Sequence, residues 1–76
     1  MNDKNQEPRF VVCINKDENE DLEVRKLYQV LPDEAGAADG LLRVVDESGE
    51  DYLYPERFFV PIQLPQAAEE AFLHAA

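Results

Sequence analysis

The chain has few of the residue types on which most catalytic sites depend. It contains one cysteine, one histidine and one serine, with no threonine and no tryptophan, in 76 residues. Nucleophilic catalysis needs a hydroxyl or thiol beside a base, yet Ser48, Cys13 and His74 belong to unrelated segments. The carboxylates also gather in loops and flank no recognisable cleft. We therefore expect no enzyme activity.

The single cysteine excludes an internal disulfide framework, which is typical of a reducing cytosol. Cys13 lies in the apolar run Phe10–Ile14, where a cysteine behaves as a small core residue. The chain also lacks an apolar leader and has no run near the roughly 20 residues needed to cross a bilayer. We predict a cytoplasmic protein that does not contact membranes.

Basic residues are scarce, because 7 lysines and arginines face 17 acidic residues and the net charge is −10. Binding to DNA or RNA depends on basic side chains that displace counterions, and a domain this acidic is repelled by nucleic acids and anionic lipids. The charge therefore favours a basic partner, or serves solubility alone.

No metal site or cofactor is predicted either. The run Asp17–Asp21 matches the opening D-x-N-x-D of a calcium loop, but Leu22 stands where the loop needs glycine and Tyr28 where it needs glutamate. The cysteine and histidine ligands that zinc prefers are also missing.

The residues that are present predict short strands. Apolar and β-branched runs separated by turn residues are typical of strands. They cover Phe10–Ile14, Leu27–Leu31, Leu41–Val45, Asp51–Tyr54 and Phe58–Ile62. Gly49 can supply the positive φ of a tight hairpin between the third and fourth strands, and Pro61 places the last strand at an edge. We expect Tyr28, Tyr52 and Tyr54 to be half-buried strand residues.

The connections are polar or rich in small residues. Residues 15–21 are charged enough to form a solvated loop, and residues 33–40 form at most a helical turn because Gly36 weakens a helix. Residues 64–76 predict a helix with one apolar face. That face consists of Leu64, Ala68, Ala71, Phe72 and Ala75. It packs on the end of the β domain, or the helix forms a weak homodimer through Phe72 and Leu73.

The segment Tyr52–Phe59 resembles the end of a Src-homology-3 domain, where a strand and an aromatic–proline pair lead through a one-turn helix to the last strand. Glu20–Val24 looks like that family's acidic loop returning to a strand, and Leu27–Leu31 and Leu42–Val45 fit the next two strands. The resemblance extends roughly from Phe10 to Ile62. It implies a mainly β fold, a five-stranded Src-homology-3-like barrel over 9–63, with a flexible segment 1–8 and a short C-terminal helix over 64–76.

Domains of that family bind proline-rich peptides in a groove lined by aromatic residues. Pro55 and Phe58 match the groove, but Leu41 stands at the position of its tryptophan, and Cys13 and Asn15 occupy the region of its tyrosines. Proline-rich recognition is therefore a minority hypothesis. The chain is more similar to the small barrels of bacterial proteins that have no such groove.

We hypothesise a non-enzymatic module that binds a protein or peptide through Leu41, Pro55 and Phe58. In the family, the acidic loop holds an arginine of the ligand, which here implies a basic partner. The loop residues concerned are Asp17, Glu18, Glu20 and Asp21. Two alternatives remain open: an acidic mimic that occupies the nucleic-acid site of a basic protein, and a structural or dimerisation domain that uses the C-terminal helix.

Overall fold

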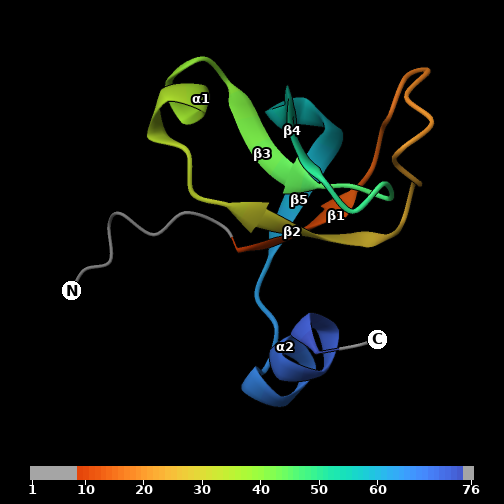
Figure 1. Ribbon diagram of the computed structural model, residues 1–76, viewed down its shortest axis with the longest axis vertical. Helices are drawn as coiled ribbons and strands as arrows, with labels where there is room; N and C mark the ends of the chain where they lie inside the picture. The colour runs from red at the N-terminus through yellow and green to blue at the C-terminus, as the bar shows by residue number, and fades with distance from the viewer. Residues whose placement is uncertain (1–8, 75–76) are drawn as a thin grey trace.

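The computed structural model describes residues 9–74 of the chain, so the predicted flexible segment 1–8 lies outside the described residues. Five antiparallel strands form one sheet in the order β4-β3-β2-β1-β5 (Figure 1). The strands are β1 (Phe10–Cys13), β2 (Leu27–Leu31), β3 (Leu41–Val45), β4 (Asp51–Pro55) and β5 (Phe59–Ile62). Every predicted strand is confirmed to within one residue at either end, and so is the mainly β class.

The helical segments are α1 (Glu34–Ala38), the one-turn 3₁₀ helix η1 (Glu56–Phe58) and α2 (Gln66–Leu73). Since β4 and β5 are the two edges of the sheet, hydrogen bonds between strands do not close it into a barrel. Among residues 9–74, no helix has the length and apolar character needed to cross a membrane.

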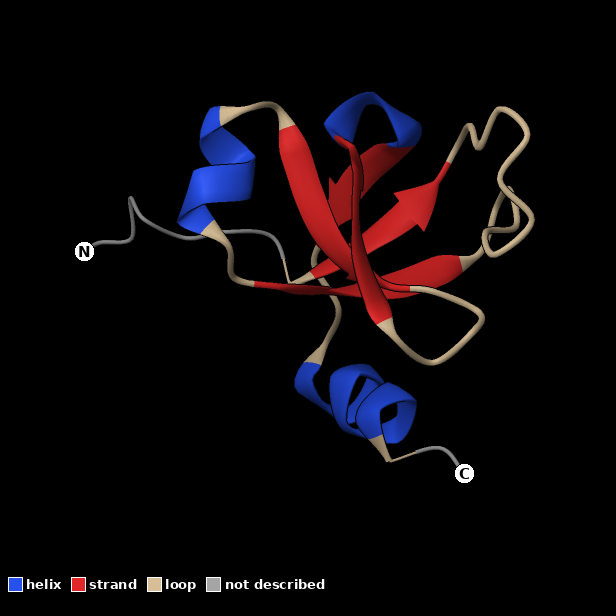
Figure 2. Cartoon of the chain, turned by 45° about the horizontal axis from the view of Figure 1, so that its top comes forward, coloured by secondary structure: helices blue, strands red, loops and turns tan. Residues whose placement is uncertain are grey.

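The strands curve around one small core (Figure 2). Its residues are Val11, Cys13, Leu22, Tyr28, Val30, Val44, Tyr54, Phe58 and Phe59. Cys13 is fully buried, as predicted. Two of the three tyrosines are more buried than expected, with 3% exposure for Tyr28 and 6% for Tyr54, whereas Tyr52 is 50% exposed.

The segment 22–24 is not a strand, which corrects the expectation drawn from the resemblance. Leu22 is fully buried in the core, but Val24 is 44% exposed. Arg25 adopts a φ of 75°, in the left-handed region, and its N–H donates to the Cys13 carbonyl at 2.6 Å. A left-handed residue interrupts an extended strand, so β2 begins only at Leu27.

Gly36 allows α1 to lie close to the sheet. A Cβ atom at this position would be 2.9 Å from Cδ2 of Leu53 in β4. The Asp33 carboxylate caps the helix by accepting the Gly36 N–H at 2.7 Å, and Arg43 of β3 donates to the same carboxylate at 2.8 Å. The predicted helical turn is thus a five-residue helix bound to the sheet by its N-cap.

The helix α2 contacts the face of the sheet that is turned away from the core, through one aromatic side chain. The Phe72 and Phe10 rings meet edge to face with centroids 5.2 Å apart, and Phe10 is 1% exposed. An ion pair between Arg9 and Glu69, at 3.5 Å, lies beside them. The helix is shorter than predicted, and Ala75 lies outside the described residues. The Phe72 ring packs within the chain, whereas Leu73 is 40% exposed.

We predict that Phe72→Ala detaches α2 and leaves the sheet folded. Loss of a half-buried aromatic contact costs about 1–2 kcal/mol. This loss weakens the attachment of α2 to the sheet and leaves the contacts between strands intact. Hydrogen exchange of the amides in 66–73 should accelerate while exchange in β1 and β2 stays unchanged. Leu73→Ala is the matched control, and faster exchange throughout the sheet of Phe72→Ala would contradict the prediction.

Candidate partner-binding site

The structure brings Leu41 and Pro55 together. They lie directly opposite each other where β3 begins and β4 ends, and both are half-buried. The Glu56 N–H donates to the Gly40 carbonyl at 2.9 Å, which holds η1 against the turn before β3. These contacts form a small, partly exposed apolar area at this end of the sheet.

Phe58 does not belong to that area, which corrects its predicted contact with a partner. Its side chain is 3% exposed, and its ring centroid lies 6.1 Å from that of Phe59 and 6.5 Å from that of Tyr54. The guanidinium carbon of Arg57 lies 5.0 Å from the Phe58 ring centroid. A phenylalanine has no hydroxyl to reach water, so its ring packs into the core.

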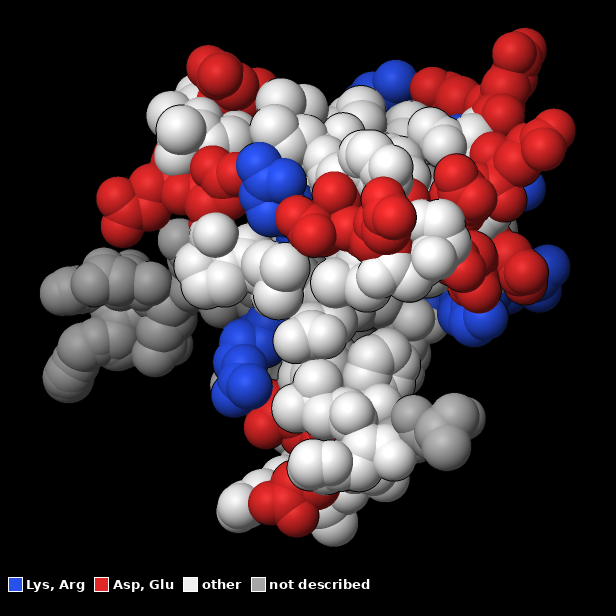
Figure 3. Space-filling model, in the orientation of Figure 1, with Lys and Arg blue, Asp and Glu red and all other residues white. Residues whose placement is uncertain are grey.

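The four acidic residues Asp17, Glu18, Glu20 and Asp21 are exposed, as predicted. Asp17 pairs with Arg57 at 3.2 Å, which connects the acidic loop to η1, next to Pro55. Within residues 9–74, none of the other three carboxylates makes an ion pair. Acidic side chains form a band across the upper half of the molecule, from the side of α1 to the acidic loop (Figure 3).

The acidic loop is exposed, but its backbone is held at several points. The Asp21 carbonyl accepts the Glu47 N–H at 2.9 Å, and the Tyr28 hydroxyl accepts the Glu23 N–H at 2.7 Å. The Asn15 side chain accepts the Asp17 N–H at 3.0 Å, and Asp17 has a φ of 51°. Aspartate is among the few residues that tolerate this left-handed conformation. The structure thus fixes the loop more than its charge alone suggests.

Glu47 is the point at which β2 and the β3–β4 hairpin meet. Its carboxylate accepts from Lys26 Nζ and from the Tyr28 hydroxyl, both at 2.7 Å. The ammonium of Lys26, followed by the Tyr28 hydroxyl, lowers the pKa of Glu47. Burial and the bond to Glu47 raise the pKa of Tyr28, which keeps the hydroxyl protonated. The two bonds hold the hairpin whose backbone holds the acidic loop.

Asp46, at the start of the hairpin, is 5% exposed. It accepts the Ser48 N–H at 2.9 Å, together with the hydroxyls of Ser48 and Tyr54. Burial alone would raise the pKa of this carboxyl, but the Ser48 and Tyr54 hydrogen bonds outweigh it and the pKa is lowered. Gly49 adopts a φ of 88°, which confirms the predicted hairpin turn.

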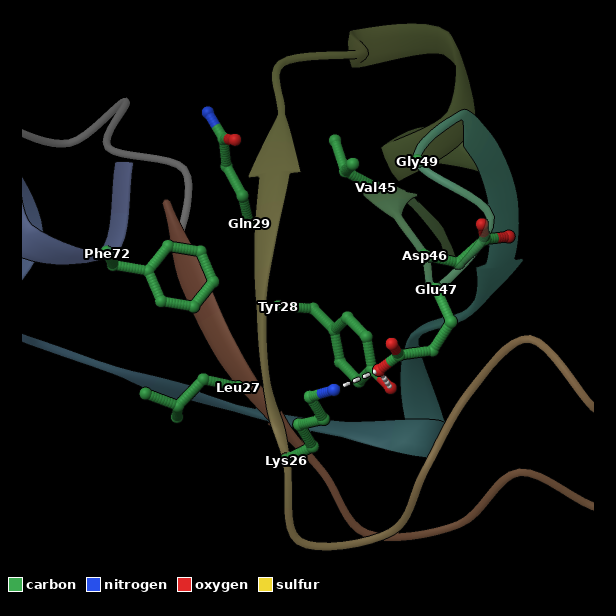
Figure 4. A pocket seen from close by; sticks show the side chains of 9 residues that line it. All are labelled: Lys26, Leu27, Tyr28, Gln29, Val45, Asp46, Glu47, Gly49 and Phe72. Carbon is green, nitrogen blue, oxygen red and sulfur yellow. Dashed lines mark hydrogen bonds and ion pairs between the residues drawn. The ribbon is translucent and has the colours of Figure 1, made fainter. Parts of the chain in front are cut away.

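A pocket of about 240 Å³ lies elsewhere, between β2, the hairpin and α2 (Figure 4). Leu27, Val45 and Phe72 supply its apolar lining, and the Lys26–Glu47 ion pair lies at its polar side. None of the predicted site residues lines it. The sequence carried no signal for this pocket, because it forms only where three distant segments meet.

The remaining chemistry of the described chain is limited. Residues 9–74 contain no cluster of three or more histidine, cysteine or acidic side chains arranged to hold a metal ion. Burial raises the pKa of the Cys13 thiol, which donates to the Asn15 carbonyl at 3.3 Å. A buried thiol with a raised pKa is a poor nucleophile.

Comparison with known proteins adds no relative, since no protein-family model, curated protein or solved structure matches the chain.

The lowered pKa of Asp46 predicts acid sensitivity. A carboxyl with a lower pKa in the folded state stabilises the protein above its unfolded pKa, near 3.8. That stability is lost as the pH falls through the folded value. We expect Asp46→Asn to lower the free energy of unfolding by about 1–3 kcal/mol at pH 7. The deficit should shrink below pH 4, as measured by urea unfolding from pH 2 to 7.

Tyr54→Phe should reproduce part of this loss, because it removes one donor to Asp46 and keeps the ring. Glu50→Gln is the control, since this neighbouring carboxylate is exposed. A deficit in Asp46→Asn that does not change with pH would contradict the assigned role of the carboxylate.

Proposed function

We propose that this chain is a non-enzymatic interaction domain that binds a protein or peptide carrying a basic side chain. The proposed site consists of Leu41 and Pro55 together with the carboxylates of the acidic loop. The observation that carries the proposal is the Asp17–Arg57 ion pair at 3.2 Å, which joins the loop to η1 beside the Leu41–Pro55 pair. The resemblance to a Src-homology-3 domain grouped these residues, and the contacts support that grouping.

The arrangement of the strands supports the proposed likeness to a Src-homology-3-like barrel. Each strand in the series β1 to β4 pairs with the next, β5 returns to β1, and η1 joins β4 to β5. We propose a partly open barrel of this kind, closer to bacterial barrels without an aromatic groove than to a domain for proline-rich peptides. The single buried cysteine agrees with a cytoplasmic setting.

Binding at this site would depend on both charge and apolar contact. An exposed ion pair contributes only about 0.2–1 kcal/mol, and salt screens it. Asp17 is already paired with Arg57, so a partner's cation would meet Glu18, Glu20 and Asp21 first. Affinity would therefore also require burial of Leu41 and Pro55, since apolar anchors supply most of the energy of small interfaces.

The acidic mimic remains a second candidate, because carboxylates cover much more of the surface than the loop alone (Figure 3). The two functions differ in which charges partner binding depends on. Binding by a mimic depends on the total charge of the surface, whereas binding at the proposed site depends on the carboxylates of the acidic loop.

The proposed site is tested by affinity capture from lysate of the source organism at 150 mM salt. Two variants are compared with the native chain: Leu41→Ser, and a loop variant in which Asp17, Glu18, Glu20 and Asp21 become their amides. We expect each variant to lose at least about tenfold in capture of the same protein, since about 1.4 kcal/mol corresponds to tenfold in affinity. Phe58 is left unchanged, because its substitution would disturb the core.

The matched control removes an equal charge elsewhere, from the exposed residues Glu34, Asp39, Glu50 and Glu70. It should retain capture. Equal losses in the loop variant and this control, together with competition by heparin, would favour the mimic and refute the loop site. Capture unchanged by both Leu41→Ser and the loop variant would refute the proposed function.

A further inference from the structure

The two edges of the sheet carry different backbone groups. Val11 of β1 lies opposite Pro61 of β5. On its other side, β1 bonds to β2 and the residue before it: the Arg9 carbonyl accepts the Val30 N–H at 2.8 Å, and the Cys13 N–H donates to the Lys26 carbonyl at 2.9 Å. Backbone groups along a strand alternate between its two neighbours, so Val11 also faces β2 and Pro61 faces outward. Proline has no N–H, and its presence on an outer edge blocks the addition of another strand.

The outer edge of β4 has no such protection at its centre. The Glu50 carbonyl accepts a backbone bond across the hairpin at 3.0 Å. Because every second residue of an antiparallel strand bonds to the same neighbour, the backbone groups of Tyr52 and Tyr54 also bond to β3. The residues between them, Asp51 and Leu53, therefore direct their N–H and C=O groups outward. Within residues 9–74, β3 is the only strand that pairs with β4.

Both faces of β4 are open beside this edge. Tyr52 and Leu53 point to opposite faces of the sheet, and they are 50% and 40% exposed. The side chain of Leu53 lies beside Gly36 of α1. The exposed part of this side chain is an apolar surface next to the outward N–H and C=O groups of β4. An incoming strand would therefore find two N–H donors and the carbonyls beside them, with side-chain contacts on either side.

Charge indicates what such a strand would carry. Glu50 and Asp51 stand at one end of β4 and Glu56 follows its other end, and all three are exposed. Arg43 is the basic residue paired with this strand, at 3.1 Å from Asp51. The edge thus keeps a negative excess, which favours lysine or arginine in the added strand.

Pairing with a second copy of the same edge is disfavoured by this charge. An antiparallel pair of β4 edges centred on Leu53 would place Glu50 of one chain opposite Glu56 of the other. Like charges directly opposite each other destabilise a ladder. A basic segment of a different protein has no such conflict.

We propose that the outer edge of β4 binds an extended basic segment of a partner protein by β-strand addition, with Leu53 exchanging both backbone hydrogen bonds with it. Strand addition of this kind derives affinity from backbone bonds and specificity from alternate side chains. The surface differs from the Leu41 site, and the inference does not depend on the function proposed for that site.

The test uses the full chain and a blocked seven-residue peptide of alternating lysine and valine. At saturating peptide, amide hydrogen exchange of Leu53 and Asp51 should slow at least about tenfold, while Tyr52 and Tyr54 change little because they already bond to β3. A peptide with N-methyl groups on its pairing edge has the same charge but lacks the donors. Its affinity should fall by about tenfold or more, as expected for the loss of two or three backbone bonds.

Leu53→Pro provides the test on the protein side. Besides the leucine side chain, it removes only an outward N–H, which an edge strand tolerates. Leu53→Ala is the matched control, because it also removes the side chain but keeps the N–H. We expect Leu53→Pro to bind the lysine–valine peptide at least about fivefold more weakly than Leu53→Ala, from the loss of one hydrogen bond.

Three results would overturn the proposal: equal affinity for the N-methylated peptide, equal binding of Leu53→Pro and Leu53→Ala, or equal affinity for a glutamate–valine peptide. A dimer that is seen by sedimentation and that Leu53→Pro dissociates would assign the edge to a second copy instead.

Circular dichroism checks that Leu53→Pro is folded. If it is not, the comparison of the two lysine–valine peptides decides. Leu41→Ser should bind these peptides normally, which separates this edge from the other site.

Discussion

The hydroxyl groups of Tyr28 and Tyr54 connect the core of this protein to its acidic surface. Both rings are buried, yet one hydroxyl donates to Glu47 and the other to Asp46, adjacent residues of the β3–β4 hairpin. A chain of this length has a small core, and side chains that are apolar along the ring and polar at the tip serve both core and surface. The position of the hairpin, and through it that of the acidic loop, depends on these two bonds.

The acidic surface follows from this arrangement. Seventeen acidic residues repel one another in a small domain. Hydrogen-bond donors are concentrated around the few carboxylates that connect elements of the fold. Asp33, Asp46 and Glu47 each accept several hydrogen bonds. Apart from the buried Asp46, the carboxylates without ion pairs in the described part of the chain are exposed, where a partner can reach them.

Much of the fold could be predicted from local pattern. Runs such as Leu27–Leu31, the glycine at position 49 and the buried position of Cys13 depend on strand periodicity and on turn chemistry, and both act between near neighbours in the sequence. The candidate site was less predictable. Leu41 and Pro55 do lie opposite each other, but Phe58 packs in the core. An aromatic residue at the end of a one-turn helix gives the same sequence pattern whether it faces a groove or the interior, so the pattern alone could not decide.

Local sequence was enough to predict the strands, the hairpin turn, the absence of a disulfide framework and the sign of the surface charge, since each depends on composition or on residues a few positions apart. Packing in three dimensions, by contrast, decided that Leu22 enters the core and that Gly36 lets α1 approach Leu53. It also decided that Pro61 faces outward at its predicted edge, while the outward groups of β4 stay unpaired within the described residues. These features depend on contacts between residues distant in the chain and on the phase of the hydrogen-bond ladder, which a one-residue change of register would reverse.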